Sequence, residues 1–254
     1  MTRLKPLNMI ITSVVILGTT GALLATQTSD RIESTAKNSY VFQTYLKNDD
    51  IKIKALNDSV VTLTGTVSEW PHWSLAEETV SGIPGVKNVE NKLEIKDGQP
   101  LENSDVWINM KVATTLMFHR HVSILKTDIE VKDGVVVLHG KASSEAQKEL
   151  TTEYVKDVDG VKRVKNDMTV ETAKKTTGEK VSEFVDDASI TAQVKIALLF
   201  HRSTNVIKTK VETKNGVVTL SGVAKNGAEK DLVAKLVNDI KGVKSIKNEI
   251  TIGS

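Results

Sequence analysis

One pattern occurs three times along this chain of 254 residues, and it limits the possible folds more than any other feature. Its clearest copy runs from Asn215 to Ile252, and moving back by 82 residues, and then by a further 75, reaches two other copies. Agreement this dense at fixed offsets indicates an internal repeat, so we expect three copies of one small module. The copies agree at Val61, Val136 and Val218; Leu63, Leu138 and Leu220; Gly65, Gly140 and Gly222; Leu75, Leu150 and Leu232; Val80, Val155 and Val237; Gly85, Gly160 and Gly242; Val86, Val161 and Val243; Lys87, Lys162 and Lys244; and Asn91, Asn166 and Asn248.

Each copy opens with the pattern of a β-hairpin. In the third copy β-branched residues flank Asn215-Gly216, and in the second copy the same place holds Asp133-Gly134. Both pairs accept the positive φ angles that a two-residue hairpin turn requires. The first copy has Asp58-Ser59 instead, which predicts a weaker or longer turn.

A helix and a last strand complete each copy. Asn226 with Glu229, and Ser144 with Gln147, have the spacing of a helix N-terminal capping box, and Pro71 suits a first helical turn. The glycines at 85, 160 and 242 are expected where these helices end. A strand, a helix and a strand in so short a span favour a parallel crossover connection. The expected buried face comprises Leu232, Leu236, Val237 and Ile240, and in the second copy Leu150, Tyr154, Val155 and Val158.

This combination of NGVVTLSG, an amphipathic helix and GVKSIKNEI resembles the BON domain, a family named for bacterial osmotic-shock and nodulation proteins. The resemblance covers three segments, at about 32–95, 104–170 and 187–252. It implies an α+β fold with three tandem αββαβ modules, each a three-stranded mixed sheet packed on two helices. It also implies envelope proteins that bind phospholipid surfaces or other envelope components and lack known catalysis. The repeated glycines at 65, 140, 222, 85, 160 and 242 are interpreted as structural.

The remaining segments read as a leader and linkers, and give module boundaries of 32–96, 104–171 and 187–252. Residues 1–29 contain Arg3 and Lys5 before an uncharged apolar run, which is typical of a secretory signal peptide. Cleavage after Ala25 is favoured, and an uncleaved anchor is the alternative. Either way, the modules are expected in the periplasm. Residues 172–186 are charged and threonine-rich, so we expect a linker that lets the second and third modules reorient.

Composition and missing motifs argue against catalysis and against nucleic-acid binding. Lysine plus arginine total 34 against 32 acidic residues, so any contact with an anionic partner must be local. The chain has no cysteine, which excludes disulfides and thiol chemistry. It also lacks phosphate-binding loops, nucleophile elbows and HExxH pairs, and we predict no cofactor and no metal.

The strongest candidate surface lies on the first helix of the second module, residues 104–118. Its core face is Ile108, Val112 and Leu116, while Trp107 begins a second apolar stripe. The stripe either inserts shallowly into a membrane surface or packs against a neighbouring module. For the first alternative, the candidate lipid- or partner-binding residues are Trp107, Met110, Lys111, Met117, His119 and Arg120.

Two further features have ordinary explanations beside functional ones. Identical Phe-His-Arg triplets end the first helices of the second and third modules at 118–120 and 200–202, where cations favour the helix dipole. The aromatic segment 70–73 of the first module either closes a small core or offers an exposed surface. The sequence therefore predicts a non-enzymatic envelope protein that associates with phospholipid and supports osmotic stress tolerance, or alternatively a periplasmic chaperone or scaffold.

Overall fold

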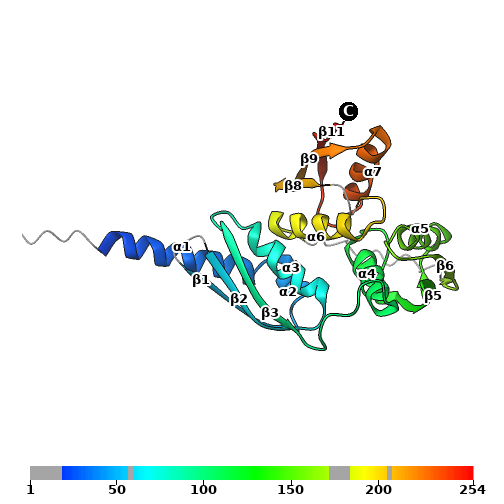
Figure 1. Ribbon diagram of the computed structural model, residues 1–254, viewed down its shortest axis with the longest axis horizontal. Coiled ribbons are helices and arrows are strands. Elements are labelled where there is room, and N and C mark those ends of the chain that lie inside the picture. Colours follow the sequence, from blue (N-terminus) through cyan, green and yellow to red (C-terminus); the bar gives the residue numbers. More distant parts are fainter. Residues whose placement is uncertain (1–18, 57–59, 172–183, 205–207, 254) are drawn as a thin grey trace, which may run out of the picture.

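The computed structural model describes residues 19–56, 60–171, 184–204 and 208–253, with side chains from residue 28 onward, and it contains three αβ modules (Figure 1). The chain beyond these ranges includes most of the predicted leader, the Asp58-Ser59 turn and most of the linker 172–186. Among the described helices, none combines the length and apolar character that a membrane span requires.

Module 1 differs from the others at its start. Its opening segment is broken into two helices, α1 (Thr19–Lys37) and a short α2 (Tyr40–Thr44), whereas each of the other modules opens with one helix. The break has a local cause, because the Ser39 hydroxyl caps the new helix by accepting from the Phe42 backbone N–H. The remaining elements are β1 (Asp50–Leu56), β2 (Val60–Val67), α3 (Trp70–Ser81) and β3 (Asn88–Ile95).

Modules 2 and 3 share one element plan. Module 2 comprises α4 (Asp105–Phe118), a 3₁₀ turn η1 (Ile124–Lys126), β4 (Thr127–Lys132), β5 (Val135–Ala142), α5 (Glu145–Lys156), β6 (Arg163–Asn166) and β7 (Thr169–Val170). Module 3 comprises α6 (Asp187–Phe200), β8 (Thr209–Lys214), β9 (Val217–Ala224), α7 (Gly227–Asn238), β10 (Ser245–Asn248) and β11 (Thr251–Ile252).

The sheets have the predicted mixed topology. In each module the first two strands form an antiparallel hairpin, and the last strand runs parallel to the central one after the helical crossover. In modules 2 and 3 that last strand is broken into two short pieces, whereas β3 of module 1 is continuous. In module 3, Ile250 is buried at the break between the two pieces, and Ile252 is exposed.

The predicted hairpin turns of modules 2 and 3 are confirmed, and an aspartate of the first helix in each module binds the turn. Asn215 and Gly216 both have positive φ, as do Asp133 and Gly134. The carboxylate of Asp187, at the start of α6, accepts hydrogen bonds from the backbone N–H groups of Asn215 and Gly216 at 2.6 and 2.8 Å. Asp105 does the same for the turn of module 2. Each first helix is thus tied to its own hairpin.

The predicted capping boxes are present as well. The backbone N–H of Glu229 donates to the Asn226 side chain, and the Glu229 carboxylate accepts from the N–H of Lys225. Pro71 lies in the first turn of α3. The predicted helix ends are wrong by several residues, because α3, α5 and α7 end at Ser81, Lys156 and Asn238 and the glycines follow a further turn. Those glycines have positive φ in the connection to the last strand.

The repeated asparagine has a structural role that its position did not reveal. Asn166 donates from its amide to the Lys148 carbonyl of α5 and accepts from the Met168 backbone N–H. Asn91 and Asn248 make the corresponding bonds in modules 1 and 3. The residue therefore ties the last strand to the second helix in every module.

Modules 1 and 3 share one hydrophobic core, whereas module 2 has a separate one. Buried residues of modules 1 and 3 form one continuous cluster, which also takes in Phe118 from α4, while module 2 has a cluster of its own. Helix α6 lies in the middle of the molecule and packs against α3, α4 and α7 (Figure 1). Most of its residues are buried, including Ser189 and Gln193. The three modules consequently form one body around α6.

Candidate functional surfaces

The Phe-His-Arg triplets join modules 2 and 3 through a reciprocal set of backbone hydrogen bonds. The N–H of Arg120 donates to the Asp239 carbonyl, and the N–H of Lys241 donates to the Phe118 carbonyl, both at 3.0 Å. The same two bonds occur 82 residues apart in reverse, from Arg202 to Asp157 and from Asp159 to Phe200. Each module presents the same patch to the other, as in the self-complementary interface of a two-fold dimer.

The two arginine side chains complete this arrangement. One guanidinium nitrogen of Arg120 donates to the carbonyls of Ile240 and Val243, at 2.7 Å each. Arg202 donates to the carbonyls of Val158 and Val161, at 3.3 and 2.8 Å. A charged donor that satisfies two carbonyls in a turn fixes both position and orientation. We call these reciprocal contacts of residues 118–120 and 200–202 the arginine clasp.

Two histidines are buried inside the clasp. His119 is fully buried, and its Nδ1–H donates to the Thr115 carbonyl at 2.7 Å, so its Nε2 is a bare acceptor with no hydrogen-bond partner among the described residues. Its ring lies against Tyr154, with ring centroids 3.9 Å apart. Burial lowers the pKa of His119 to about 4. Burial likewise lowers the pKa of His201, so the clasp holds both rings neutral near pH 7.

Side chains also connect modules 2 and 3. The Tyr154 hydroxyl donates to the Asp239 carboxylate at 2.9 Å, and the Lys241 ammonium donates to the Met117 carbonyl at 2.7 Å. Leu150 and Tyr154 on α5 and Leu232 and Leu236 on α7 are half-buried and line the hollow between the two modules. The expectation that these modules reorient is therefore wrong, because backbone, charge and apolar contacts all hold them together.

Module 1 is attached by different means. At the place of the triplet it has Phe42-Gln43-Thr44, and the last two residues are exposed. Instead, the backbone N–H groups of Tyr40 and Val41 donate to the side chains of Asp186 and Ser189, next to the start of α6. Helix α3 packs along α6, where Glu78 pairs with Lys195 at 2.6 Å.

The predicted lipid- or partner-binding residues lie together on or just after α4, and most of them contact other parts of the protein. Trp107 lies against Trp70 of module 1, with centroids 5.3 Å apart. Met110 is buried, and Lys111 is buried in an ion pair with Asp159 at 2.9 Å. Met117 packs against the shared core of modules 1 and 3, while His119 and Arg120 belong to the clasp. These contacts favour the inter-module alternative for the stripe.

The aromatic segment of module 1 is used in the same way. Trp70 contacts Phe200 as well as Trp107, and the Trp73 indole donates to the Leu93 carbonyl at 3.2 Å. Both tryptophans pack against the core that modules 1 and 3 share. Core closure, together with packing between modules, accounts for this segment.

One Ser-His-Asp group has the residue types of a hydrolase but not the geometry. Ser68 and Asp49 both contact the same nitrogen of His72, Nδ1, at 2.9 and 2.6 Å. A nucleophilic triad needs the serine on the other ring nitrogen, which here lies 3.6 Å from Glu69. Burial opposes ionisation of Asp49, but hydrogen bonds from His72 and Ser68 outweigh it and lower the pKa of this carboxyl. The group joins the start of β1 to α3.

Metal binding gains no support from the described part of the chain. Within it, no cluster of three or more histidine or acidic side chains has the arrangement of a metal site. His119 and His121 do not form a pair of metal ligands, because His119 is buried in the clasp and His121 is exposed.

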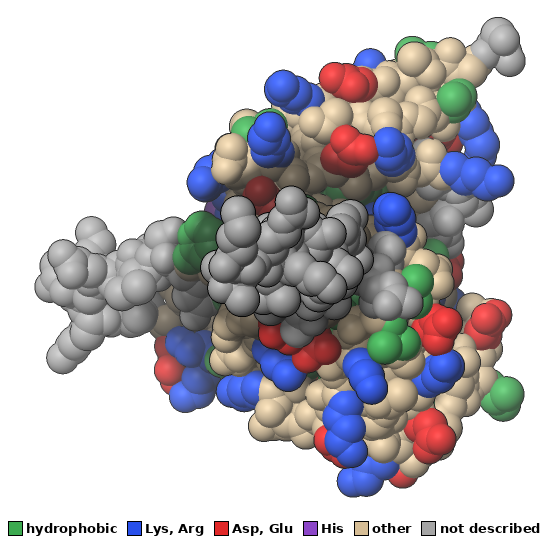
Figure 2. All heavy atoms as spheres, turned by 90° about the vertical axis from the view of Figure 1, so that its left-hand side faces the viewer, with side chains coloured by type: hydrophobic (Ala, Val, Ile, Leu, Met, Phe, Trp, Pro, Cys, Tyr) green, Lys and Arg blue, Asp and Glu red, His purple; other side chains and the backbone are tan. Residues whose placement is uncertain are grey.

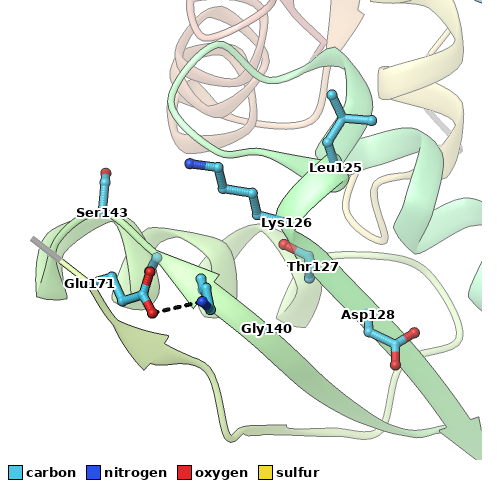
Figure 3. A pocket seen from close by; sticks show the side chains of 9 residues that line it. Leu125, Lys126, Thr127, Asp128, Gly140, Ser143 and Glu171 are labelled. Carbon is cyan, nitrogen blue, oxygen red and sulfur yellow. Dashed lines mark ion pairs between the residues drawn. The ribbon is translucent and has the colours of Figure 1, made fainter. Parts of the chain in front are cut away.

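A hollow of about 600 Å³ opens on module 2 where β4 and β5 meet the turn η1 (Figure 3). Lys126 points into it from the side of Leu125, and Glu171 closes the other side through an ion pair with Lys141 at 2.7 Å. Leu125 is 95% exposed. Among the described residues that line this open hollow, no buried polar group and no catalytic arrangement is found.

Modules 2 and 3 differ strongly in surface charge although they share a fold. Residues 208–247 of module 3 contain nine lysines and four acidic residues, whereas the equivalent residues 126–165 contain eight basic and eight acidic residues. In Figure 2 lysine and arginine side chains outnumber acidic ones on the upper lobe, which is module 3. Val223 and Ile252, at the end of the same sheet, are 59% and 57% exposed. The sequence reasoning missed this surface because it averaged charge over the whole chain.

Comparison with known proteins adds to this geometry. The family model of the BON domain matches residues 28–97, 104–172 and 186–254. The Osmotically-inducible protein Y of Escherichia coli strain K12 is 34% identical over 148 residues, which are 58% of this chain and 71% of that protein. An "Uncharacterized protein in gshII 5'region" of Anaplasma centrale is 29% identical over 143 residues, 56% of this chain and 90% of that protein. Among solved structures, the C-terminal domain of CdsD, a structural protein of the type III secretion system of Chlamydia trachomatis, matches with 14% identity and a TM-score of 0.24, covering 88% of this chain and 96% of that domain.

Proposed function

Because the chain belongs to the BON-domain family along all three modules, we propose that it is a non-enzymatic protein of the cell envelope that acts under osmotic stress by adhering to anionic phospholipid surfaces. A relative that is named as osmotically inducible supports the stress role. The apolar leader predicted from residues 1–29 supports a periplasmic location.

The uneven charge of modules 2 and 3 carries the lipid part of the proposal. Anionic head groups attract clustered lysines, and each lysine near such a surface contributes about 1 kcal/mol. Module 3 supplies Lys208, Lys214 and Lys247 at exposed positions of or beside β8 and β10. The exposed Val223 and Ile252 add apolar surface suited to shallow insertion between head groups. The candidate residues of α4 are engaged within the protein, so the contact is assigned to module 3.

Vesicle flotation with matched charge reversals tests this assignment. The test variant carries Lys208→Glu, Lys214→Glu and Lys247→Glu, and the control carries Lys126→Glu, Lys132→Glu and Lys165→Glu at the same places in module 2. We expect the unchanged protein to float with phosphatidylglycerol vesicles but not with phosphatidylcholine vesicles, and added salt to weaken this binding. The module 3 variant should bind at least about 10-fold more weakly, and the module 2 variant within about 2-fold of the unchanged protein.

Two results would contradict the proposal. Equal absence of binding to both vesicle types would remove the lipid function altogether. Equal loss in the two variants would remove module 3 as the contact surface, because it would show an effect of net charge alone.

The alternative function, a chaperone or scaffold for other envelope proteins, also has an observation in its favour. Leu101, shortly before α4, and Val106, in the first turn of α4, are 83% and 65% exposed. Apolar side chains left open next to a groove are typical of a surface that receives another protein.

A further inference from the structure

Helices α4 and α6 occupy equivalent positions in modules 2 and 3, so the molecule contains the same helix face twice. On α6 this face is covered by helix α3 of module 1. The two helices approach closely at Gly82, where an added Cβ would lie 3.3 Å from the Cα of Ala188. Two turns further along α6, Lys195 pairs with Glu78 of α3. The face of α6 is thus a docking site for a helix, and it is already filled.

The equivalent face of α4 is open. Subtracting 82 from Ala188, Thr191, Ala192 and Lys195 gives Val106, Asn109, Met110 and Ala113. These four residues line a groove of about 690 Å³, together with Leu101 and Ile95 from the neighbouring connection and strand. Within the described parts of the chain, no helix covers it in the way that α3 covers α6, which leaves Leu101 and Val106 exposed.

The charge of the groove differs from that of its filled counterpart. The place of Lys195 is taken by Ala113, and Lys and Arg are absent from the described residues that line the groove. Its acidic residues are Glu69, Asp97 and Asp105. Hydrogen bonds from the backbone N–H groups of Gly134 and Asp133 lower the pKa of Asp105, whereas burial raises the pKa of Glu69. The groove therefore combines an apolar floor with an acidic edge.

We propose that this groove binds an amphipathic helix with a basic flank from another protein of the envelope. The apolar side of such a helix would cover the exposed Val106 and Leu101, beside the already buried Met110, as in other helix-in-groove complexes. Its lysines or arginines would meet the acidic edge, which gives orientation and partner choice. This activity is separate from the adhesion of module 3 to lipid and involves a different face.

Fluorescence anisotropy with two synthetic helices tests the proposal on the full chain. The first probe is a labelled leucine–lysine amphipathic helix of about 18 residues, roughly 27 Å long. The second has the same leucines with glutamate in place of lysine. We expect saturable binding of the lysine probe and at least about 10-fold weaker binding of the glutamate probe, since the groove edge is acidic.

A matched pair of substitutions locates the site. Val106→Lys places a charge in the groove, and Leu125→Lys makes the same kind of change at a more exposed leucine elsewhere in module 2. Both positions are on the surface, so folding should be little affected. Val106→Lys should weaken binding of the lysine probe at least about 10-fold, while Leu125→Lys should leave it within about 2-fold.

Three outcomes would overturn the proposal. The first is absence of saturable binding by the lysine probe. The second is equal loss in the two variants, which would mean nonspecific adhesion to acidic surface. The third is loss of vesicle flotation by Val106→Lys but not by Leu125→Lys, because the groove would then be a lipid contact and not a protein contact.

Discussion

Modules 2 and 3 hold each other by a reciprocal clasp, whereas module 1 is attached by the side of one helix. The difference follows from two residues. Where modules 2 and 3 have His119-Arg120 and His201-Arg202, module 1 has Gln43-Thr44, which supply no long cationic donor. Module 1 therefore cannot close the same contact, and it uses α3 and the N-terminal end of α2 on α6. The comparison shows that a short segment after the first helix decides how a module of this fold associates.

The largest loss of stability is expected at the glycine that all three modules share, at positions 65, 140 and 222. Gly140 has φ of +114°, and a Cβ there would overlap the carbonyl oxygen of Lys126. Gly140→Ala should therefore lower the free energy of unfolding by about 4 kcal/mol, from backbone strain and steric overlap together. Gly65→Ala should cost a similar amount, because its Cβ would meet the carbonyl of Asp50 in the same way. Urea denaturation measures both.

Gly98 provides the control for these glycines. It also has positive φ, but an added Cβ would have no other atom within 4 Å. Gly98→Ala should cost only about 1 kcal/mol, from backbone strain alone. Equal costs at Gly98 and Gly140 would show that the close approach to the first strand is not what the repeated glycine provides.

The clasp itself should show the next largest effect. Arg120→Ala removes a charged donor from two carbonyls and should destabilise the protein by about 3 kcal/mol in urea denaturation. Arg202→Ala should have a similar but smaller cost, because one of its bonds is long, at 3.3 Å. Thr44→Ala, at the equivalent place in module 1, should change stability by less than about 0.5 kcal/mol. If Thr44→Ala lowered the free energy of unfolding as much as Arg120→Ala, the proposed difference between module 1 and the clasped modules would be wrong.

The smallest of these effects is the dependence of stability on pH that arises from His119, buried in the clasp. The pKa of His119 is about 4 in the folded protein and 6.5 in an unfolded chain, so the unfolded state takes up the proton first. Stability is full above the unfolded value and decreases as the pH falls from about 6.5 towards 4. Between pH 7 and pH 5 the expected loss is about 2 kcal/mol.

His119→Gln, which copies the residue of module 1, should remove most of this pH dependence. Thermal unfolding of both proteins at pH 7 and pH 5 measures the difference. The groups around the ring are Asp239 and Tyr154, together with Glu153, Asp157, Lys235, His121 and His201. An unchanged pH profile in the variant would assign the acid sensitivity to another of these groups.

Local chemistry made much of each module predictable. The Asn215-Gly216 and Asp133-Gly134 turns, the capping residues and the parallel crossover all depend on neighbouring residues, and the structure has them as expected. The break at Ser39 and the interrupted last strands were missed. At Ser39 a side-chain hydrogen bond to the backbone competes with regular structure. The repeated asparagine alone does not explain the interrupted strands, because Asn91 makes the same bonds within the continuous β3.

The association of the modules was much less predictable. The acceptors of Arg120 are main-chain carbonyls of Ile240 and Val243, and carbonyls are common to every residue. The side chains around position 240 therefore form no pattern that would identify these carbonyls as acceptors. The identical triplets at 118–120 and 200–202 were the only available signal, and a helix-end cation explained them locally. The structure shows the arginines crossing to the partner module instead.

The clasp has a consequence for how such a chain changes over time. A carbonyl oxygen survives every amino-acid replacement, so the receiving half of each contact cannot be lost by a point mutation. For the hydrogen bonds of the clasp, only the two arginines and the turn geometry need to be kept. The outer surfaces can therefore differ in charge without loss of these hydrogen bonds, as the lysine-rich module 3 and the balanced module 2 do.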